Sequence, residues 1–140
     1  MPANARVLIA EDEPNILTVL AFLMRRSGFE TRLAADGEEA LALLSTFRPH
    51  LLLLDVMLPQ RSGLDVCRAL RADPALAGTR VLMLTAKGGA KDIEAGMAAG
   101  ADDYLTKPFS TQDLVGTVMR LLALPRPAGA GGEAGKGEGA

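Results

Sequence analysis

Short apolar runs alternate with longer segments of helical periodicity along the first 124 residues of the chain. The short runs are three to five residues long and are bounded by turn residues, which is typical of β-strands. The predicted strands are Arg6–Ala10, Phe29–Leu33, Leu51–Leu54, Val81–Leu84 and Asp103–Leu105.

The segments between these runs repeat apolar residues three or four positions apart, as an amphipathic helix does. In the first segment Ile16, Val19 and Leu23 would share one face. Pro14 near its start and Gly28 just past its end suit the two ends of a helix. The predicted helices are Pro14–Ser27, Glu38–Thr46, Leu64–Arg71, Asp92–Ala99 and Thr111–Leu124.

This alternation predicts an α/β fold, in which right-handed crossovers build a parallel sheet with helices on both faces. A chain of 140 residues is long enough for one domain around a single core, and we place that domain at residues 1–124. From Pro125 onward the chain is mostly Pro, Gly, Ala and isolated charges, which cannot bury a core. We expect residues 125–140 to be a disordered tail or the start of a linker.

Composition narrows the function classes. The net charge is −2 and the basic residues are scattered, which argues against direct nucleic acid binding by this chain. The single cysteine excludes a disulfide framework and a cysteine zinc site. No apolar run approaches the roughly 18 residues of a membrane span, and the N-terminus is too short and polar for a secretory signal. We therefore expect a cytoplasmic protein that does not contact the membrane.

Polar residues follow several of the predicted strands, and one of them ends a run of four leucines. Carboxyl ends of parallel strands meet at one edge of a sheet, where ligands bind. The residues that this rule brings together are Glu11, Asp12, Asp55, Thr85 and Lys107.

Crowded carboxylates repel one another unless a positive charge lies between them. Mg²⁺ prefers oxygen ligands and is usually held by one or two carboxylates plus phosphate oxygens, so it suits this edge. The chain after Asp55 would also leave a backbone carbonyl near Met57 able to face the metal. Aspartate is a known covalent nucleophile for phosphoryl groups, and Thr85 and Lys107 could hold the phosphoryl oxygens.

Four motifs stand in order along the chain: "VLIAEDE", "LLLLDVMLPQRSG", "VLMLTAK" and "GADDYLTKPF". Together they resemble the receiver domains of bacterial two-component response regulators over about residues 5 to 124. The resemblance implies a flavodoxin-like (βα)₅ doubly wound sheet with strand order 2-1-3-4-5.

The resemblance also implies roles for individual residues. Asp55 would accept a phosphoryl group from a phosphohistidine on a sensor histidine kinase or a histidine phosphotransfer protein, and Thr85 and Lys107 would bind its oxygens. The peptide bond between Lys107 and Pro108 is expected to be cis. The implied Mg²⁺ ligands are Glu11, Asp12, Asp55 and the backbone carbonyl of Met57.

Tyr104 stands at the aromatic switch position of the family. Phosphorylation would draw Thr85 inward and let Tyr104 turn in behind it, which changes the face formed by the fourth helix, the fifth strand and the fifth helix. The implied partners are the kinase or phosphotransfer protein, an unidentified downstream protein and, on phosphorylation, a second copy of this chain.

The flanking motifs "DVMLP", "LTAKG" and "ADDYLTKPFS" resemble receivers that precede winged-helix DNA-binding domains. Receivers of that subset dimerise through charge pairs on the switched face. Asp102 and Asp103 are present here, but Ile93, Thr117 and Leu124 stand where the subset often has basic partners.

Two readings compete with a stand-alone signalling receiver. The chain could be the N-terminal receiver of a longer DNA-binding regulator. It could also be a hydrolase that forms an aspartyl phosphate, but such enzymes generally carry a second acid two residues after the nucleophile, where Met57 stands. We therefore expect a phosphoacceptor rather than an enzyme with multiple turnover.

Overall fold

Five parallel strands form one sheet in the computed structural model, which describes residues 5–86 and 89–124. The strand order is β2-β1-β3-β4-β5, so the predicted α/β class and order 2-1-3-4-5 are confirmed. The predicted tail at 125–140 lies outside the described residues. The strands are β1 (Arg6–Ala10), β2 (Glu30–Ala34), β3 (Leu51–Asp55), β4 (Arg80–Thr85) and β5 (Asp103–Thr106).

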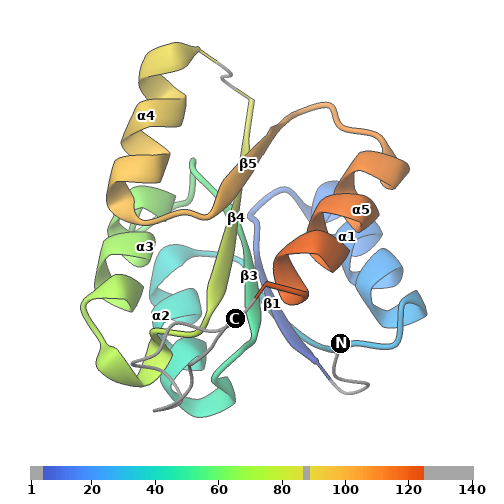
Figure 1. Ribbon diagram of the computed structural model, residues 1–140, viewed down its shortest axis with the longest axis horizontal. Helices are drawn as coiled ribbons and strands as arrows, with labels where there is room; N and C mark the ends of the chain where they lie inside the picture. The colour runs from blue at the N-terminus through green and yellow to red at the C-terminus, as the bar shows by residue number, and fades with distance from the viewer. Residues whose placement is uncertain (1–4, 87–88, 125–140) are drawn as a thin grey trace.

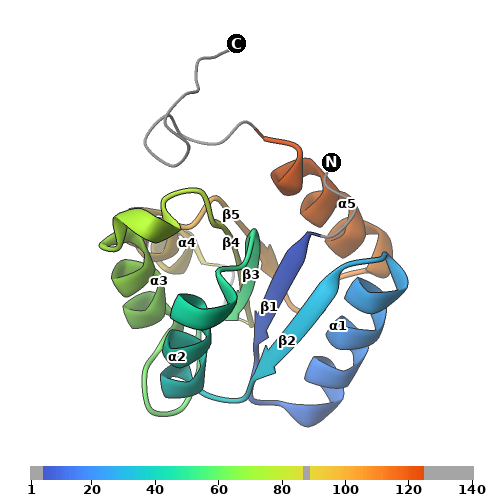
Figure 2. The ribbon, with the colours of Figure 1, turned by 90° about the horizontal axis from the view of Figure 1, so that it is seen from below.

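Helices cover both faces of the sheet (Figure 1). One face carries α1 (Pro14–Arg26) and α5 (Thr111–Leu122), and the other carries α2 (Gly37–Phe47), α3 (Gly63–Arg71) and α4 (Ala90–Ala99). Figure 2 shows the same division from a second direction. A 3₁₀ turn at Pro74–Leu76 was not predicted, because three residues are too few to show a period. Within the described ranges, no helix has both the length and the apolar character needed to cross a bilayer.

The leucine run is buried on both sides of the sheet. All five residues of β3 are buried, and the side chains of its leucines alternate between two apolar clusters. Leu52 and Leu54 join the cluster under α2, α3 and α4, whereas Leu51 and Leu53 join the cluster under α1 and α5. Each buried leucine contributes roughly 1.5 to 3 kcal/mol, which explains why a central parallel strand is continuously apolar.

The predicted start of β2 was one residue too early. Phe29 belongs to the closing turn of α1, because its backbone N–H donates to the carbonyl of Met24 at 3.1 Å. Gly28 precedes it with a φ of +93°, the left-handed conformation that ends many helices. The strand pairing therefore begins at Glu30, opposite Arg6.

Two helix boundaries also differ from the prediction. α4 begins at Ala90 rather than Asp92, because the N–H of Ile93 donates to the carbonyl of Gly89 and forms an earlier turn. α5 ends at Leu122, two residues before the predicted end, because the last backbone hydrogen bonds tighten to partners three residues back. The remaining ends differ by a single residue or agree.

Arg71 connects the end of α3 to the end of the sheet at which β4 and β5 begin. Its guanidinium donates to the carbonyls of Gly100 at 2.8 Å and Thr79 at 2.7 Å, and to the Asp102 carboxylate at 2.8 Å. The same Asp102 oxygen accepts from the N–H of Val81 at 2.8 Å. These contacts join α3, the start of β4 and the loop before β5.

We expect Arg71→Ala to lower the free energy of unfolding by about 2 to 3 kcal/mol, because it removes the charged donor to two carbonyls and to Asp102, which keeps only the Val81 N–H and the more distant Arg80. Arg68→Ala is the matched control on the same helix, since Arg68 makes an exposed ion pair with Asp65. That substitution should cost less than about 1 kcal/mol. Urea denaturation measures both. Equal losses would show that the Arg71 contacts add no stability of their own.

Candidate functional site

β1 and β3 end at the upper edge of the sheet in Figure 1. Three carboxylates that stand at or just after these ends lie close together. Glu11, Asp12 and Asp55 each offer one oxygen, and these oxygens lie within 4.8 Å of one another. Glu11 is fully buried and Asp55 is 4% exposed, whereas Asp12 is open to solvent. The edge that the sequence predicted therefore holds an acidic cluster.

Lys107 lies between the two buried acids. Its ammonium donates to Glu11 at 2.8 Å and to Asp55 at 3.2 Å. Its backbone N–H donates to the carbonyl of Thr85 at 2.7 Å, and its peptide bond to Pro108 is cis, as expected. Lys107 thus connects the loop after β5 to the ends of β1 and β3.

Backbone N–H groups hold the second oxygen of each buried acid. The N–H of Met57 donates to Asp55 at 3.1 Å, and the N–H of Glu13 donates to Glu11 at 3.1 Å. Both carboxylates are therefore oriented from two sides, by the ammonium and by the chain that follows each strand.

Burial and neighbouring charges shift two pKa values in this cluster. Burial raises the pKa of Glu11 and the charge of Asp55 raises it further, while the bonds from Lys107 and the Glu13 N–H oppose this. Burial by itself would lower the pKa of Lys107, but the two carboxylates outweigh it and the pKa is raised. Lys107 therefore stays positively charged at neutral pH.

The donor set fits a divalent cation. Three carboxylates against one ammonium leave a formal charge of −2 when all are ionised. All the candidate ligand atoms are oxygens, which Mg²⁺ prefers. Met57 stands two residues after Asp55 and is 62% exposed, and the ligand role of its carbonyl stays a prediction.

Thr85 and Tyr104 lie beside the acidic cluster, on the side of α4. Thr85 ends β4 and is 5% exposed, and Tyr104 on β5 is half-buried. Both line a small cavity whose other walls include Val56 and Met97. The structure thus places the two predicted switch residues around one space, and their switching roles stay predictions.

Sequence reasoning missed Gly63, which shapes the site. A Cβ atom at Gly63 would stand 2.3 Å from the carbonyl oxygen of Asp55, so no larger residue fits without moving the backbone. Its N–H also donates to the carbonyl of Val56 at 2.9 Å. A glycine eight positions after the acid indicated only the start of a helix, because the contact exists only once the loop has folded back.

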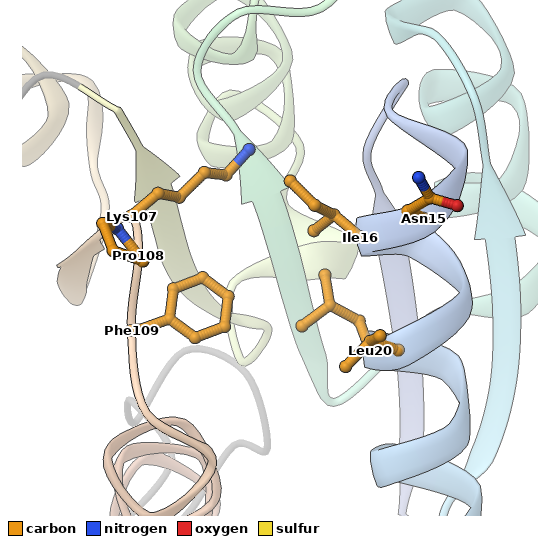
Figure 3. A pocket seen from close by; sticks show the side chains of 7 residues that line it. Asn15, Ile16, Leu20, Lys107, Pro108 and Phe109 are labelled. Carbon is orange, nitrogen blue, oxygen red and sulfur yellow. The ribbon is translucent and has the colours of Figure 1, made fainter.

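An apolar groove lies next to the cluster, between α1 and the loop after β5 (Figure 3). Its volume is about 450 Å³. Figure 3 shows Phe109 facing Ile16 and Leu20 across the groove, while the Lys107 side chain extends away toward the end of β3. The lining residues are Asn15, Ile16, Val19, Leu20, Lys107, Pro108 and Phe109.

Comparison with known families decides what kind of domain this is. The sequence model described as "Response regulator receiver domain" matches residues 7–119. The chain belongs to the response regulator receiver family. The expected resemblance is therefore confirmed.

Individual relatives agree with this assignment. The receiver is 44% identical over 117 residues to the DNA-binding response regulator MtrA of Mycolicibacterium smegmatis, a match that covers 84% of this chain and 50% of MtrA. The chain spans about half the length of the curated relatives it matches. The similarity of its flanking motifs to receivers of DNA-binding regulators is thus also confirmed.

Two solved structures show the same fold. A response regulator from Chloroflexus aurantiacus superposes with a TM-score of 0.82 at 40% identity, covering 86% of this chain and 99% of that one. The receiver domain of the sensor histidine kinase PA1611 from Pseudomonas aeruginosa gives a TM-score of 0.80 at 30% identity, covering 86% and 99%. That second structure has a magnesium ion coordinated in its active site cleft.

Removal of the Lys107 charge should make stability depend more steeply on pH. In Lys107→Met without metal, the ammonium no longer opposes the burial of Glu11, so the pKa of Glu11 in the folded state should rise further above its unfolded value of about 4. The folded receiver then binds more protons than the unfolded chain, and its stability falls as pH rises from the unfolded pKa of Glu11 through the raised folded one. Each unit by which the folded pKa of Glu11 exceeds the unfolded one removes about 1.4 kcal/mol from the free energy of unfolding once both states are ionised.

Urea denaturation in EDTA at several pH values measures this effect. Lys91→Met, which removes an exposed lysine of α4, is the matched control and should follow the parent protein. A constant difference in stability between Lys107→Met and the parent protein over this pH range would contradict the role of Lys107 as counter-charge.

Proposed function

We propose that this receiver domain accepts a phosphoryl group on Asp55 from a phosphohistidine of a sensor histidine kinase or a histidine phosphotransfer protein. The supporting observation is the position of Asp55, a buried carboxylate at the end of a rigid strand, bonded to Lys107 at 3.2 Å and next to two further acids. In the transfer, a carboxylate oxygen of Asp55 bonds to phosphorus, the P–N bond breaks, and the imidazole leaves with that electron pair.

Mg²⁺ is the proposed cofactor, held by Glu11, Asp12, Asp55 and the carbonyl of Met57. The acidic cluster supports this, as does the magnesium ion in the cleft of the related PA1611 receiver. The cation would neutralise the acids and the charge on the incoming phosphoryl oxygens. Glu11 is one methylene longer than aspartate, and its ion pair with Lys107 at 2.8 Å fixes one of its two carboxylate oxygens.

Lys107 and Thr85 would bind the phosphoryl oxygens. The Lys107 ammonium is already 3.2 Å from Asp55, so it can follow the charge from the carboxylate to the phosphoryl group. Thr85 ends the strand next to β3, and its hydroxyl would donate a hydrogen bond. Thr85 and Tyr104 line the same small cavity, and an inward turn of Tyr104 behind Thr85 would alter the face of α4, β5 and α5.

The altered face would control either a separate protein or a DNA-binding domain, as the similarity to MtrA suggests. The two acids that the charge pairs of the subset would use already have partners within the chain: Asp102 pairs with Arg71, and Asp103 pairs with Arg120. A phosphorylation-dependent homodimer through these acids would have to exchange those pairs. We therefore place binding of another domain or protein ahead of homodimerisation.

The apolar groove beside Lys107 is the proposed docking site for the phosphodonor. It lies between α1 and the Pro108–Phe109 loop, so a helix of the donor seated there would face Asp55. The proposed location is the cytoplasm, where the phosphohistidine of a sensor kinase is made available.

Asp55→Asn should abolish acid-labile labelling by acetyl phosphate, because the amide cannot replace the carboxylate as nucleophile. The measurement is labelling stoichiometry by intact mass, together with circular dichroism to show that the fold persists. Asp65→Asn, which changes an exposed aspartate of α3, should label as the parent protein does.

Two results would argue against this function. Stoichiometric labelling of Asp55→Asn would move the acceptor to another residue. Continuous phosphate release from an aryl phosphate, faster than single-site labelling, would favour the hydrolase, whose second acid is replaced here by Met57.

Labelling should also require Mg²⁺, because Lys107 alone does not balance three carboxylates. EDTA should prevent it, and Asp12→Asn should raise the Mg²⁺ concentration for half-maximal labelling at least tenfold, by order of magnitude. Asp113→Asn in the first turn of α5 is the control. Undiminished labelling in EDTA would remove the metal from the proposal.

A further inference from the structure

The loop between β3 and α3 carries Met57 and is held against the start of α2. It leaves the sheet directly after Asp55, and the carbonyl of Pro59 accepts a hydrogen bond from the N–H of Gly37 at 3.1 Å. Gly37 is the first residue of α2 and is buried. The helix and the loop therefore meet at one backbone contact close to the acidic cluster.

This contact needs a residue without a side chain. A Cβ atom at Gly37 would stand 2.2 Å from the carbonyl oxygen and 2.4 Å from the Cβ of Arg61. The obstruction includes backbone, so it cannot be relieved by rotating a flexible side chain. Gly37 does not have a positive φ, so the close approach of the loop is the feature that requires glycine.

The side-chain attachments of this part of the loop are weaker. Arg61 pairs with Glu38 at 3.0 Å, but both side chains are about half exposed, and such pairs contribute less than about 1 kcal/mol. Val56 and Leu58 are only partly buried against the core. The Met57 N–H is held by Asp55 at 3.1 Å, so a displacement of Pro59 would turn the Met57–Leu58 segment between these two points and with it the Met57 carbonyl.

We propose that Gly37 is a positioning residue for the Mg²⁺ site, because it lets the loop approach α2 closely and so sets the position of the Met57 carbonyl. The inference rests on the proposed function and extends it to a residue outside the acidic cluster. With alanine at position 37 the two backbones would have to separate by roughly 1 Å to reach van der Waals contact. Mg²⁺ requires near-ideal octahedral geometry, so a displacement of that size matters.

The test compares Gly37→Ala with Gly116→Ala in the full chain. Gly116 is exposed on α5 and a Cβ there meets nothing within 4 Å, which makes it a matched control. Calorimetric titration with MgCl₂ should show at least a tenfold weaker Kd, by order of magnitude, for Gly37→Ala and an unchanged Kd for Gly116→Ala. Urea denaturation in EDTA establishes that both variants are folded.

The outcomes separate this inference from the proposed function. A folded Gly37→Ala with the Kd of the parent protein overturns the role of Gly37 and leaves the Mg²⁺ site intact. A parent protein that binds no Mg²⁺ overturns the proposed site itself.

A second measurement uses the unaltered protein, so it holds even when Gly37→Ala does not fold. Coupling between two sites is reciprocal, so Mg²⁺ must stabilise the loop contact if the contact favours Mg²⁺ binding. Saturating Mg²⁺ should slow hydrogen exchange of the Gly37 N–H more than that of the Arg48 N–H, which bonds to Leu44 at the other end of α2. Equal slowing of the two amides, or none, overturns the proposal.

Discussion

The site depends on the charged hydrogen bonds from the Lys107 ammonium to Glu11 and Asp55. These residues are distant in the chain, and they meet because β1, β3 and β5 end at the same edge of one parallel sheet. Two buried carboxylates at adjacent strand ends would repel strongly in a medium of low polarity. The single ammonium allows both to remain there, and the remaining negative charge makes the cluster receptive to a cation.

Two kinds of backbone position the acidic cluster: the buried strand β3 and the loop that follows it. Asp55 cannot shift easily, because the four leucines before it are packed on both faces of the sheet. The chain after Asp55 has little apolar anchoring and is positioned by backbone contacts with Gly37 and Gly63, at which a Cβ atom would collide. A buried strand can thus fix a charged group, while glycine contacts place the neighbouring carbonyls.

The two ends of the sheet carry different kinds of residues: candidate functional groups at one end and structural contacts at the other. The acids, Thr85 and Lys107 gather at the carboxyl end, whereas the Arg71 contacts bind α3, β4 and the β5 loop at the opposite end. β5 is an edge strand whose residues are all at least partly exposed. The edge of the sheet beside Tyr104 is therefore open to a partner, whereas the Arg71 contacts are internal to the domain.

The sequence by itself determined the fold class, the succession of elements and the acids that meet at the sheet edge. These follow from local hydrophobic periods and from the rule that parallel strands end together, while the strand order came from the family motifs. The tertiary structure alone decided that Phe29 closes a helix, that Lys107 bonds both buried acids, and that Gly37 admits a loop. Each of these depends on distances between atoms brought together by folding, and no local pattern of residues encodes such a distance.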